Sequence, residues 1–259
     1  MTSPKLTLGY STLAMRVGNI ILPLEKSGWD SLVLIQNPTG IAWRGEGLAT
    51  LMMRGDVSLE ELSTMGVAKS RNRAIWQAKG EYLVFSDDDI EFNVKGLETA
   101  IEYLDNHPEL ALLLGQAKDP SGELRKRYPK KAGKLTRMNS AKAATYEMII
   151  RVEAIRQLGV FFDEEFGAGA KNYLGDEYIF IVDLLKAGGR ASFVPITIAM
   201  HPKESSGSRW GTAEDRRARA NIFTRVFGPL APLIRLGFGI RRLRELGSIK
   251  NLWEFVIGK

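Results

Sequence analysis

The chain has 259 residues, of which 44% are hydrophobic and 25% charged, and this composition is that of a folded globular protein rather than a disordered or fibrous one. It contains no cysteine, which excludes disulfides, thiolate catalysis and cysteine-ligated metal centres. The net charge of +6 is compatible with nucleic acid, anionic lipid or a phosphorylated substrate as the partner.

Strand and helix patterns alternate in the first part of the chain. Residues 6–11 and 31–36 are rich in β-prone apolar side chains and predict two strands, with a helix fitting between them. Residues 58–61 carry a capping-box pattern, so we expect a helix to begin there and to continue along the apolar face of 67–78. Residues 81–85 form a short apolar run of the kind buried in a parallel sheet.

The alternation continues downstream. The patterns predict helices over 94–104, 152–158 and 178–186, and strands over 110–114, 146–150 and 191–199. Residues 118–142 are polar and basic and predict an irregular loop over the site. The expected class is therefore α/β, with a single mostly parallel central sheet flanked by helices. No apolar run reaches the length of a membrane span, and we expect a cytoplasmic protein.

Three aspartates, Asp87, Asp88 and Asp89, follow the apolar run 81–85 after a single serine. Ligands of open α/β sheets bind beyond the carboxyl ends of the strands, so a site is expected here. Adjacent carboxylates repel one another unless a cation or hydrogen-bond donors offset the cost. Mg²⁺ or Mn²⁺ would do so and would leave room for phosphate oxygens. A solvated acidic turn is the alternative, with about equal weight for a bare triplet.

Three sequence blocks follow one another in the order of a known enzyme family. In residues 66–89, a glycine and an Ala-Lys-Ser-Arg-Asn helix start precede an Ala-Lys-Gly helix end, an apolar strand and the aspartates. Residues 162–167 and 175–178 form an acidic second block, and residues 194–201 are a strand that ends in a histidine. These blocks resemble glycosyltransferase family 2, which implies the Rossmann-like GT-A fold. The second block has the family's Glu-Asp pair in reversed order.

The resemblance implies roles for the residues of the first and third blocks. It implies that Asp89 holds a divalent metal, Mn²⁺ or Mg²⁺, with Asp87 and His201 as further ligands. Asp87 and Asp88 are implied on the donor side, with Asp88 supporting the turn. The family's usual aspartate after the second strand is absent, and Gln36 and Asn37 stand near its place. The other donor-binding candidates are Ser11, Asn37, Arg71 and Asn72.

Some of these residues also have purely structural interpretations. Arg71 is equally well interpreted as an exposed arginine on a helix surface. A lone histidine such as His201 is usually structural, although its position at a strand end favours a metal or diphosphate role.

An inverting sugar transfer needs a general base that takes the proton of the acceptor hydroxyl. The resemblance implies that Glu177 is this base and that Asp176 orients the acceptor or the neighbouring helix. In the alternative interpretation, both are a helix N-terminal acidic pair stabilised by the macrodipole. The family pattern favours the catalytic role about two to one.

Residues 211–259 differ from the rest of the chain, because arginines alternate with bulky apolar residues and several glycines and prolines interrupt the helical pattern. We predict a basic, amphipathic helical extension. It suits the inner face of an anionic membrane, as a peripheral attachment, and it equally suits packing on the core or on another subunit. No nucleic-acid-binding motif is present, and nucleic acid is not an expected partner.

The predicted organisation is a catalytic domain over 1–210, with a nucleotide-sugar-binding half (1–117) and an acceptor-binding half (118–210), followed by the tail. The resemblance implies a metal-dependent glycosyltransferase that moves a sugar from a UDP- or dTDP-linked donor to a hydroxyl of a glycan or lipid-linked acceptor in cell-surface polysaccharide synthesis. A non-catalytic GT-A-like module at a lipid surface remains an alternative. A metal-dependent phosphoester hydrolase is less favoured, because the chain contains no P-loop sequence.

Overall fold

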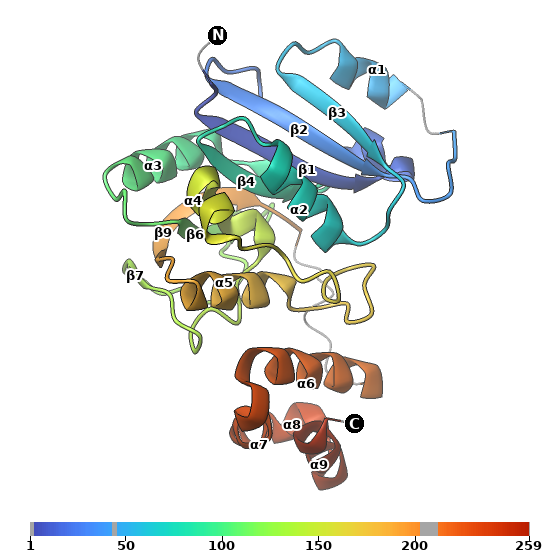
Figure 1. Cartoon of the computed structure of the whole chain (residues 1–259), viewed down its shortest axis with the longest axis vertical. Helices are drawn as coiled ribbons and strands as arrows, with labels where there is room; N and C mark the ends of the chain where they lie inside the picture. Colours follow the sequence, from blue (N-terminus) through green and yellow to red (C-terminus); the bar gives the residue numbers. More distant parts are fainter. Residues whose placement is uncertain (1–2, 43–45, 203–211, 259) are drawn as a thin grey trace.

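A computed structural model describes residues 3–42, 46–202 and 212–258. Within these residues, nine strands form one open sheet, in the order β3-β2-β1-β4-β8-β6-β9-β5 with β7 paired to β9 (Figure 1). The strands are β1 (Leu6–Leu13), β2 (Trp29–Gln36), β3 (Val57–Leu62), β4 (Tyr82–Asp87), β5 (Glu91–Phe92), β6 (Leu112–Lys118), β7 (Gly133–Lys134), β8 (Met148–Arg151) and β9 (Ala191–Met200). The α-helices are α1 (Glu46–Met52), α2 (Val67–Gln77), α3 (Val94–Asp105), α4 (Val152–Leu158), α5 (Asp176–Lys186), α6 (Ala213–Phe227), α7 (Ala231–Arg241), α8 (Leu243–Leu246) and α9 (Ile249–Ile257).

The long strand pairings are parallel, as the α/β pattern predicts. β1 lies between β2 and β4 and is parallel to both, and β6 is parallel to β9. The short strand β8 is antiparallel to β4 on one side and to β6 on the other, and so joins the two halves of the sheet. The expected strands and helices after residue 80 are confirmed in kind, with small differences at their ends.

Both faces of the sheet are buried, which explains why its strands are continuous apolar runs. Successive side chains of β4 point to opposite faces. Tyr82 and Val84 belong to the core under α3, whereas Leu83 and Phe85 belong to the core under α2, α4 and α5. Because side chains of β4 are packed in the cores on both faces of the sheet, the direction in which its carboxyl end leaves the sheet is also fixed.

One prediction in the first part of the chain is wrong, and another is met by a short helix. Residues 58–61 lie in β3, which pairs with β2, and α2 begins only after Gly66. The alternating pattern of Val57 to Leu62 suits a half-buried strand next to β2, and this pairing outweighs the local capping-box pattern. Between β1 and β2, the expected helix is present as a short 3₁₀-helix, η1 (Ala14–Asn19). Pro23 lacks the backbone N–H that a longer helix would need.

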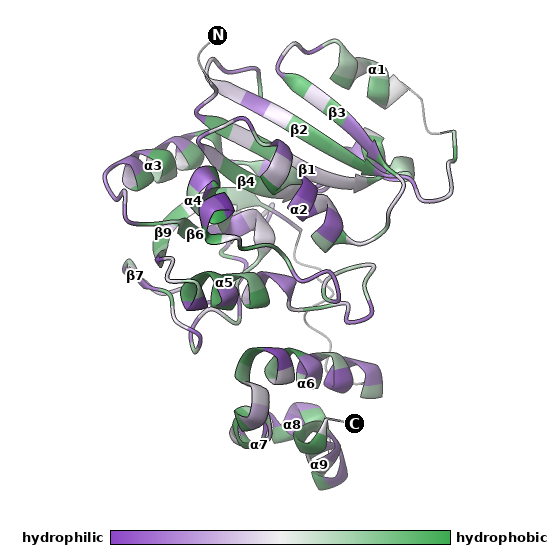
Figure 2. Ribbon diagram, in the orientation of Figure 1, coloured by the Kyte–Doolittle hydropathy of each residue, from purple (hydrophilic) through white to green (hydrophobic). Residues whose placement is uncertain are grey.

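The C-terminal helices α6 to α9 lie at the end of the molecule opposite β1 to β3 (Figure 1). α6 packs on α5 through a shared apolar cluster that includes Ile179, Val182, Ile222 and Val226. Figure 2 shows hydrophobic and hydrophilic residues interspersed along these helices. The expected helical extension is therefore present and packs on the α/β core. The predicted boundary between residues 210 and 211 lies outside the described residues.

Several arginines of the extension bind within the chain. Arg225 joins α6 to the core through Asp163 and Asp183, at 2.7 and 2.6 Å. Arg216 pairs with Glu254 at 3.3 Å, and Arg235 is buried. These arginines therefore bind groups of the chain itself, which favours packing on the core as the role of α6.

Candidate active site

A cavity of about 290 Å³ lies beyond the carboxyl ends of β1, β2 and β4. Six of the predicted site residues line it, together with residues that were not predicted to bind a ligand. The predicted ones are Ser11, Arg71, Asp87, Asp88, Asp89 and His201. The others include Thr12, Arg16, Gln36, Gly66 and Gly169. The structure therefore brings residues of the first and third sequence blocks to the edge of the sheet where a ligand was expected.

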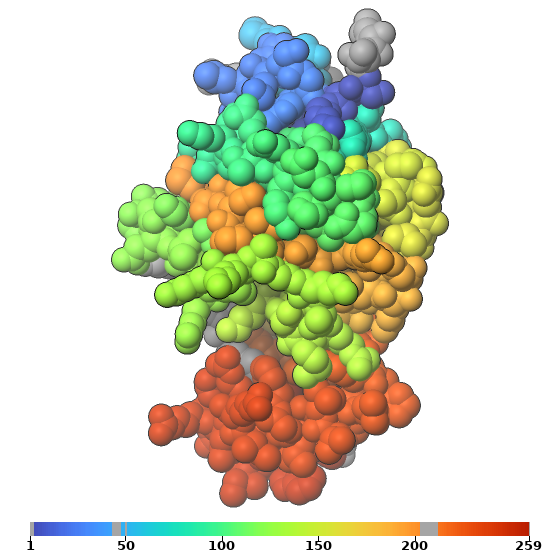
Figure 3. Space-filling view, turned by 90° about the vertical axis from the view of Figure 1, so that its left-hand side faces the viewer, coloured from blue at the N-terminus to red at the C-terminus, as the bar shows by residue number. Residues whose placement is uncertain are grey.

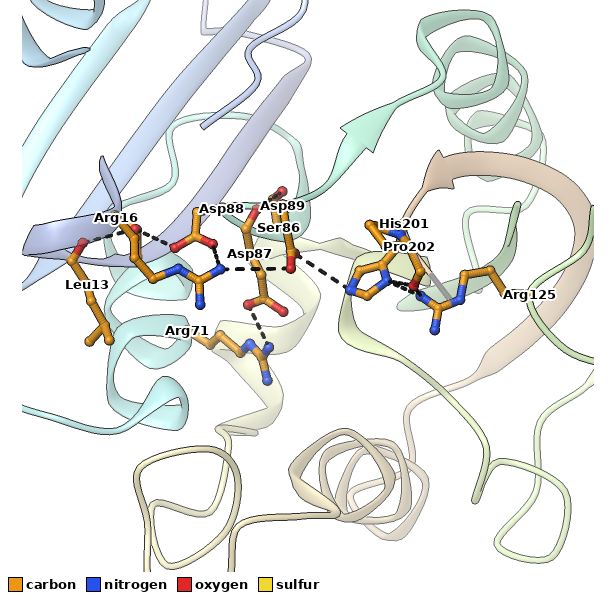
Figure 4. Close-up of polar contacts among 11 residues, drawn as sticks. Leu13, Arg16, Arg71, Ser86, Asp87, Asp88, Asp89, Arg125, His201 and Pro202 are labelled. Atoms are coloured by element: carbon orange, nitrogen blue, oxygen red, sulfur yellow. Dashed lines mark hydrogen bonds and ion pairs between the residues drawn. The ribbon is translucent and has the colours of Figure 1, made fainter. Parts of the chain in front are cut away.

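The three aspartates point in different directions (Figure 4). Asp88 is 5% exposed, accepts a hydrogen bond from Thr12 Oγ1 at 2.7 Å and pairs with Arg16. Burial raises the pKa of Asp88, and Thr12 and Arg16 oppose this change. The side chains of Asp87 and Asp89 are 38% and 43% exposed. Asp88 thus holds the turn in place, while Asp87 and Asp89 are accessible to a ligand.

Arg71 is buried and lies between two carboxylates. It pairs with Asp87 at 3.1 Å and with Asp176, and its guanidinium lies 5.7 Å from the ring centre of Phe162. The interpretation of Arg71 as an exposed surface arginine is therefore wrong. Because Asp87 ends β4 and Asp176 begins α5, this one side chain connects the end of β4 to the first turn of α5, which also carries Glu177.

Asp176 and Glu177 occupy the first turn of α5, after Gly175, whose φ of 91° is a conformation that favours glycine. Asp176 is buried against Arg71. Glu177 is partly buried and accepts a hydrogen bond from Thr145 Oγ1 at 2.9 Å. Burial, followed by the neighbouring charge of Asp176, raises the pKa of Glu177 to about 8, although Arg71 acts in the opposite direction. A carboxylate in this environment is a stronger base than an exposed one.

His201 lies at the end of β9, where its ring stacks on Tyr146 at 4.9 Å between centroids. Its Nε2 is 3.6 Å from Asp89 Oδ1, and its Nδ1 contacts Arg125 and the carbonyl of Pro202 (Figure 4). Asp89 and His201 could therefore both ligate one cation. Within the described residues, no group of three or more acidic or histidine side chains is suited to hold a metal. A metal at this pair would need its remaining ligands from water or from phosphate oxygens.

Two of the predicted donor-binding residues do not line the cavity. Asn72 uses both ends of its amide on the backbone of Phe162, at 2.9 and 2.7 Å. Asn37 is buried and donates to Ile41 O and to Glu61 Oε1. Ser11 does line the cavity and accepts a hydrogen bond from Ser70 Oγ at 2.8 Å.

Arg16 and Gln36 are the two lining residues that matter most among those that sequence reasoning left out as site residues. Arg16 contacts Asp88 and lies 3.9 Å from Asp89. The Oε1 atom of Gln36 is buried and has no hydrogen-bond partner among the described residues. The position of Gln36 at the end of a predicted strand was the available signal, whereas nothing in the local pattern marked Arg16.

The comparisons with known proteins agree with this geometry. Residues 52–160 match the family model described as glycosyl transferase family 2. No curated protein matches the sequence. Three solved structures of S. aureus TarS share the fold. The 1–349 fragment with UDP has a TM-score of 0.59 and 18% identity, over 93% of this chain and 72% of that one. The 1–349 fragment with UDP-GlcNAc has a TM-score of 0.59 and 17% identity, over 97% of this chain and 81% of that one.

The third structure is described as S. aureus TarS, with no residue range. It has a TM-score of 0.58 and 18% identity, over 95% of this chain and 44% of that one. At sequence identities this low, the structural similarity establishes a shared fold and nothing more. The glycosyl transferase match covers the segment from the end of α1 to the end of α4, and so includes α2, β4 and the three aspartates. The resemblance to glycosyltransferase family 2 is thus confirmed: the chain carries that family's pattern in residues 52–160, on a GT-A fold.

Proposed function

We propose that the chain is a glycosyltransferase that moves a sugar from a nucleoside diphosphate donor to an acceptor hydroxyl. One observation carries the proposal: Arg71 joins Asp87, at the end of β4, to Asp176, at the start of α5. Asp87 and the first turn of α5, which carries Glu177, therefore lie against the same arginine. The family match over 52–160 and the TarS complexes with UDP and UDP-GlcNAc support a nucleotide-sugar as the donor.

On the donor side, Gln36 offers an unpaired acceptor to a base or ribose, and Asp87 faces the same cavity. Asp89 and His201 are the residues that would hold Mn²⁺ or Mg²⁺. Such a cation would neutralise negative charge on the departing nucleoside diphosphate. The cationic Arg16 lies at the same edge of the cavity and adds to this electrostatic stabilisation.

On the acceptor side, Glu177 removes the proton of the attacking hydroxyl, and the hydroxyl oxygen attacks the anomeric carbon opposite the leaving group. The raised pKa of Glu177 strengthens it as a base. Asp176 is already paired with Arg71, so its role is to position Arg71 and the start of α5. An acceptor in cell-surface polysaccharide synthesis and inversion at the anomeric carbon belong to the same proposal.

The test measures donor binding and turnover separately. Binding of UDP and UDP-GlcNAc is measured by calorimetry with and without Mn²⁺, and turnover by UDP release. Glu177→Gln should remove turnover and keep donor affinity, whereas Asp89→Ala should weaken Mn²⁺-dependent donor binding. Glu109→Gln is the matched control, since Glu109 is an exposed carboxylate beside His107.

Each competing function predicts a different result. A non-catalytic module would bind the donor and lose nothing in Glu177→Gln. A phosphoester hydrolase would release phosphate from a simple phosphoester and would not need an acceptor. Nucleotide binding that is absent with every base, with and without metal, would refute the proposal itself.

The C-terminal extension supports peripheral attachment to an anionic membrane as a second proposal. Six large apolar residues of this region are more than half exposed: Leu230, Leu233, Ile240, Ile249, Trp253 and Ile257. The last three are four residues apart and so share one face of α9. Arg241, Arg244 and Lys250 are exposed near them. No helix within the described residues has the length and hydrophobicity needed to cross a bilayer.

Co-sedimentation with anionic vesicles tests this second proposal. Trp253→Ser should reduce the bound fraction, and Trp76→Ser, an equally exposed tryptophan on α2, is the matched control. Binding that is the same in both variants would contradict membrane attachment through α9.

A further inference from the structure

A second cavity, of about 960 Å³, lies on the side of the sheet formed by β6 and β9. Its apolar lining includes Leu114, Leu135 and Phe193, and the ring of Tyr128 stacks nearly parallel on Phe193 at 6.1 Å. Six basic residues also line it: Lys126, Arg127, Lys130, Lys131, Lys134 and Lys142. We name it the basic cavity. Figure 3 shows the segment that carries these residues, in yellow-green, projecting between the orange β9 region and the red C-terminal helices.

The described residues leave the positive charge of the basic cavity largely uncompensated. Lys126 pairs with Glu147 at 2.7 Å, and Glu147 is fully buried and also accepts a hydrogen bond from Tyr128 Oη at 2.5 Å. Glu147 is the one acidic residue among those that line the cavity. The other five cations are exposed and form no ion pair with any described residue. Such a concentration of one sign of charge in a concave surface attracts an anionic ligand.

The basic cavity adjoins the reaction centre through three consecutive residues. In the 3₁₀-helix η2 (Thr145–Glu147), Thr145 binds Glu177, Tyr146 stacks on His201, and Glu147 lines the basic cavity. Two other consecutive residues, Arg125 and Lys126, also link the two sites. Arg125 contacts His201, and Lys126 contacts Glu147 in the basic cavity. A ligand in the basic cavity therefore lies next to the candidate base and separate from the donor cavity, with which it shares no lining residue.

We propose that the basic cavity binds the acceptor and that the acceptor is an anionic glycan. This inference rests on the proposed glycosyltransferase function. The exposed lysines suit phosphate or carboxylate groups along the chain of the acceptor. The aromatic and apolar lining suits the flat apolar faces of sugar rings. A neutral glycan would gain nothing from the five unpaired cations, and a purely apolar ligand would leave them unpaired.

The experiment measures the affinity of the full chain for three oligosaccharides of similar length by fluorescence or calorimetry. The probes are an oligogalacturonate, a phosphorylated malto-oligosaccharide and neutral maltohexaose, so carboxylate and phosphate are tested separately. In the double variant Lys131→Ala/Lys134→Ala, anionic binding should weaken roughly tenfold, because two ionic contacts are lost. The matched control Lys79→Ala/Lys95→Ala removes the same charge from exposed lysines outside both cavities and should leave the affinity unchanged.

The outcomes distinguish this inference from the proposed function. Preference for either anionic probe, lost in the first double variant with UDP binding intact, supports the inference and identifies the anionic group. Equal binding of the neutral probe, no binding of any probe, or equal loss in the control variant overturns it. Displacement of the anionic probe by UDP overturns it as well, as does stronger binding of anionic vesicles or of an oligonucleotide at the same lysines. If UDP and UDP-sugars do not bind while the anionic probe does, the donor assignment fails and the anion site stands.

Discussion

Replacing Arg71 by methionine tests the central connection of the site. Arg71 and Asp176 have side chains that are each 5% exposed, so the substitution leaves a carboxylate buried without its partner. Removal of one member of a buried ion pair costs about 3–5 kcal/mol of unfolding free energy. For a chain of this size, 1 kcal/mol corresponds to about 2–4 °C in melting temperature. We therefore expect Arg71→Met to melt roughly 6–20 °C lower, measured by circular dichroism.

A double variant separates the loss of the pair from the loss of packing. Arg71→Met with Asp176→Asn has no buried unpaired charge, and it should recover most of the lost stability. Arg73→Met is the matched control on the same helix, because Arg73 is exposed and pairs with Glu60 at 2.6 Å. Its melting temperature should not change measurably. If Arg71→Met melts like the control, or if the double variant is no more stable than the single one, Arg71 is not the structural link described here.

Three further substitutions test the burial of Glu177 and two glycine positions. The pKa of Glu177 is raised to about 8 in the folded chain, whereas the unfolded chain releases this proton at the ordinary pKa of 4.5. The contribution of this group to stability is therefore full below pH 4.5 and is lost as the pH rises towards 8. Glu177→Gln should therefore raise the melting temperature more at pH 8 than at about pH 5, and equal changes at both would contradict the assignment. Gly96→Ala should destabilise by at least about 1–3 kcal/mol in urea unfolding, because its Cβ would lie 1.9 Å from the carbonyl oxygen of Thr197; wild-type stability would rule out this close approach. Gly237→Ala in α7, where a Cβ meets nothing within 4 Å, should instead stabilise by about 0.5–1 kcal/mol, and a loss would show that α7 is packed differently.

Much of the fold could be predicted from local pattern, and the wrong assignment of residues 58–61 has a non-local cause. The strand at 81–85 and the helices after it follow from apolar periodicity that tertiary contacts reinforce. Residues 58–61 satisfy a local helix-start rule, yet they form β3 because β2 offers unpaired backbone groups along its edge. Strand pairing is non-local, so a short window of sequence does not contain the information that decides it.

The candidate site shows the same division. Position at a strand end was enough to single out Asp87, Asp89 and His201, because every parallel strand delivers its carboxyl end to the same edge of the sheet. Asn72 matched the family pattern equally well, but its amide is used on the backbone of Phe162. A family pattern therefore identifies the residues at a site without separating those that face the ligand from those that hold the site together.

By itself, the sequence determined the α/β class, the edge of the sheet where the candidate site lies and the basic character of the C-terminal extension, since each follows from periodicity, spacing or composition. The tertiary structure alone decided that Arg71 is buried against Asp176, which is 105 positions away, and that Asp88 turns inward to Arg16. It also decided that the basic residues of 126–142 surround a cavity with β9. The physical reason is that burial and charge pairing depend on contacts between distant segments, and these exist only after the sheet has assembled.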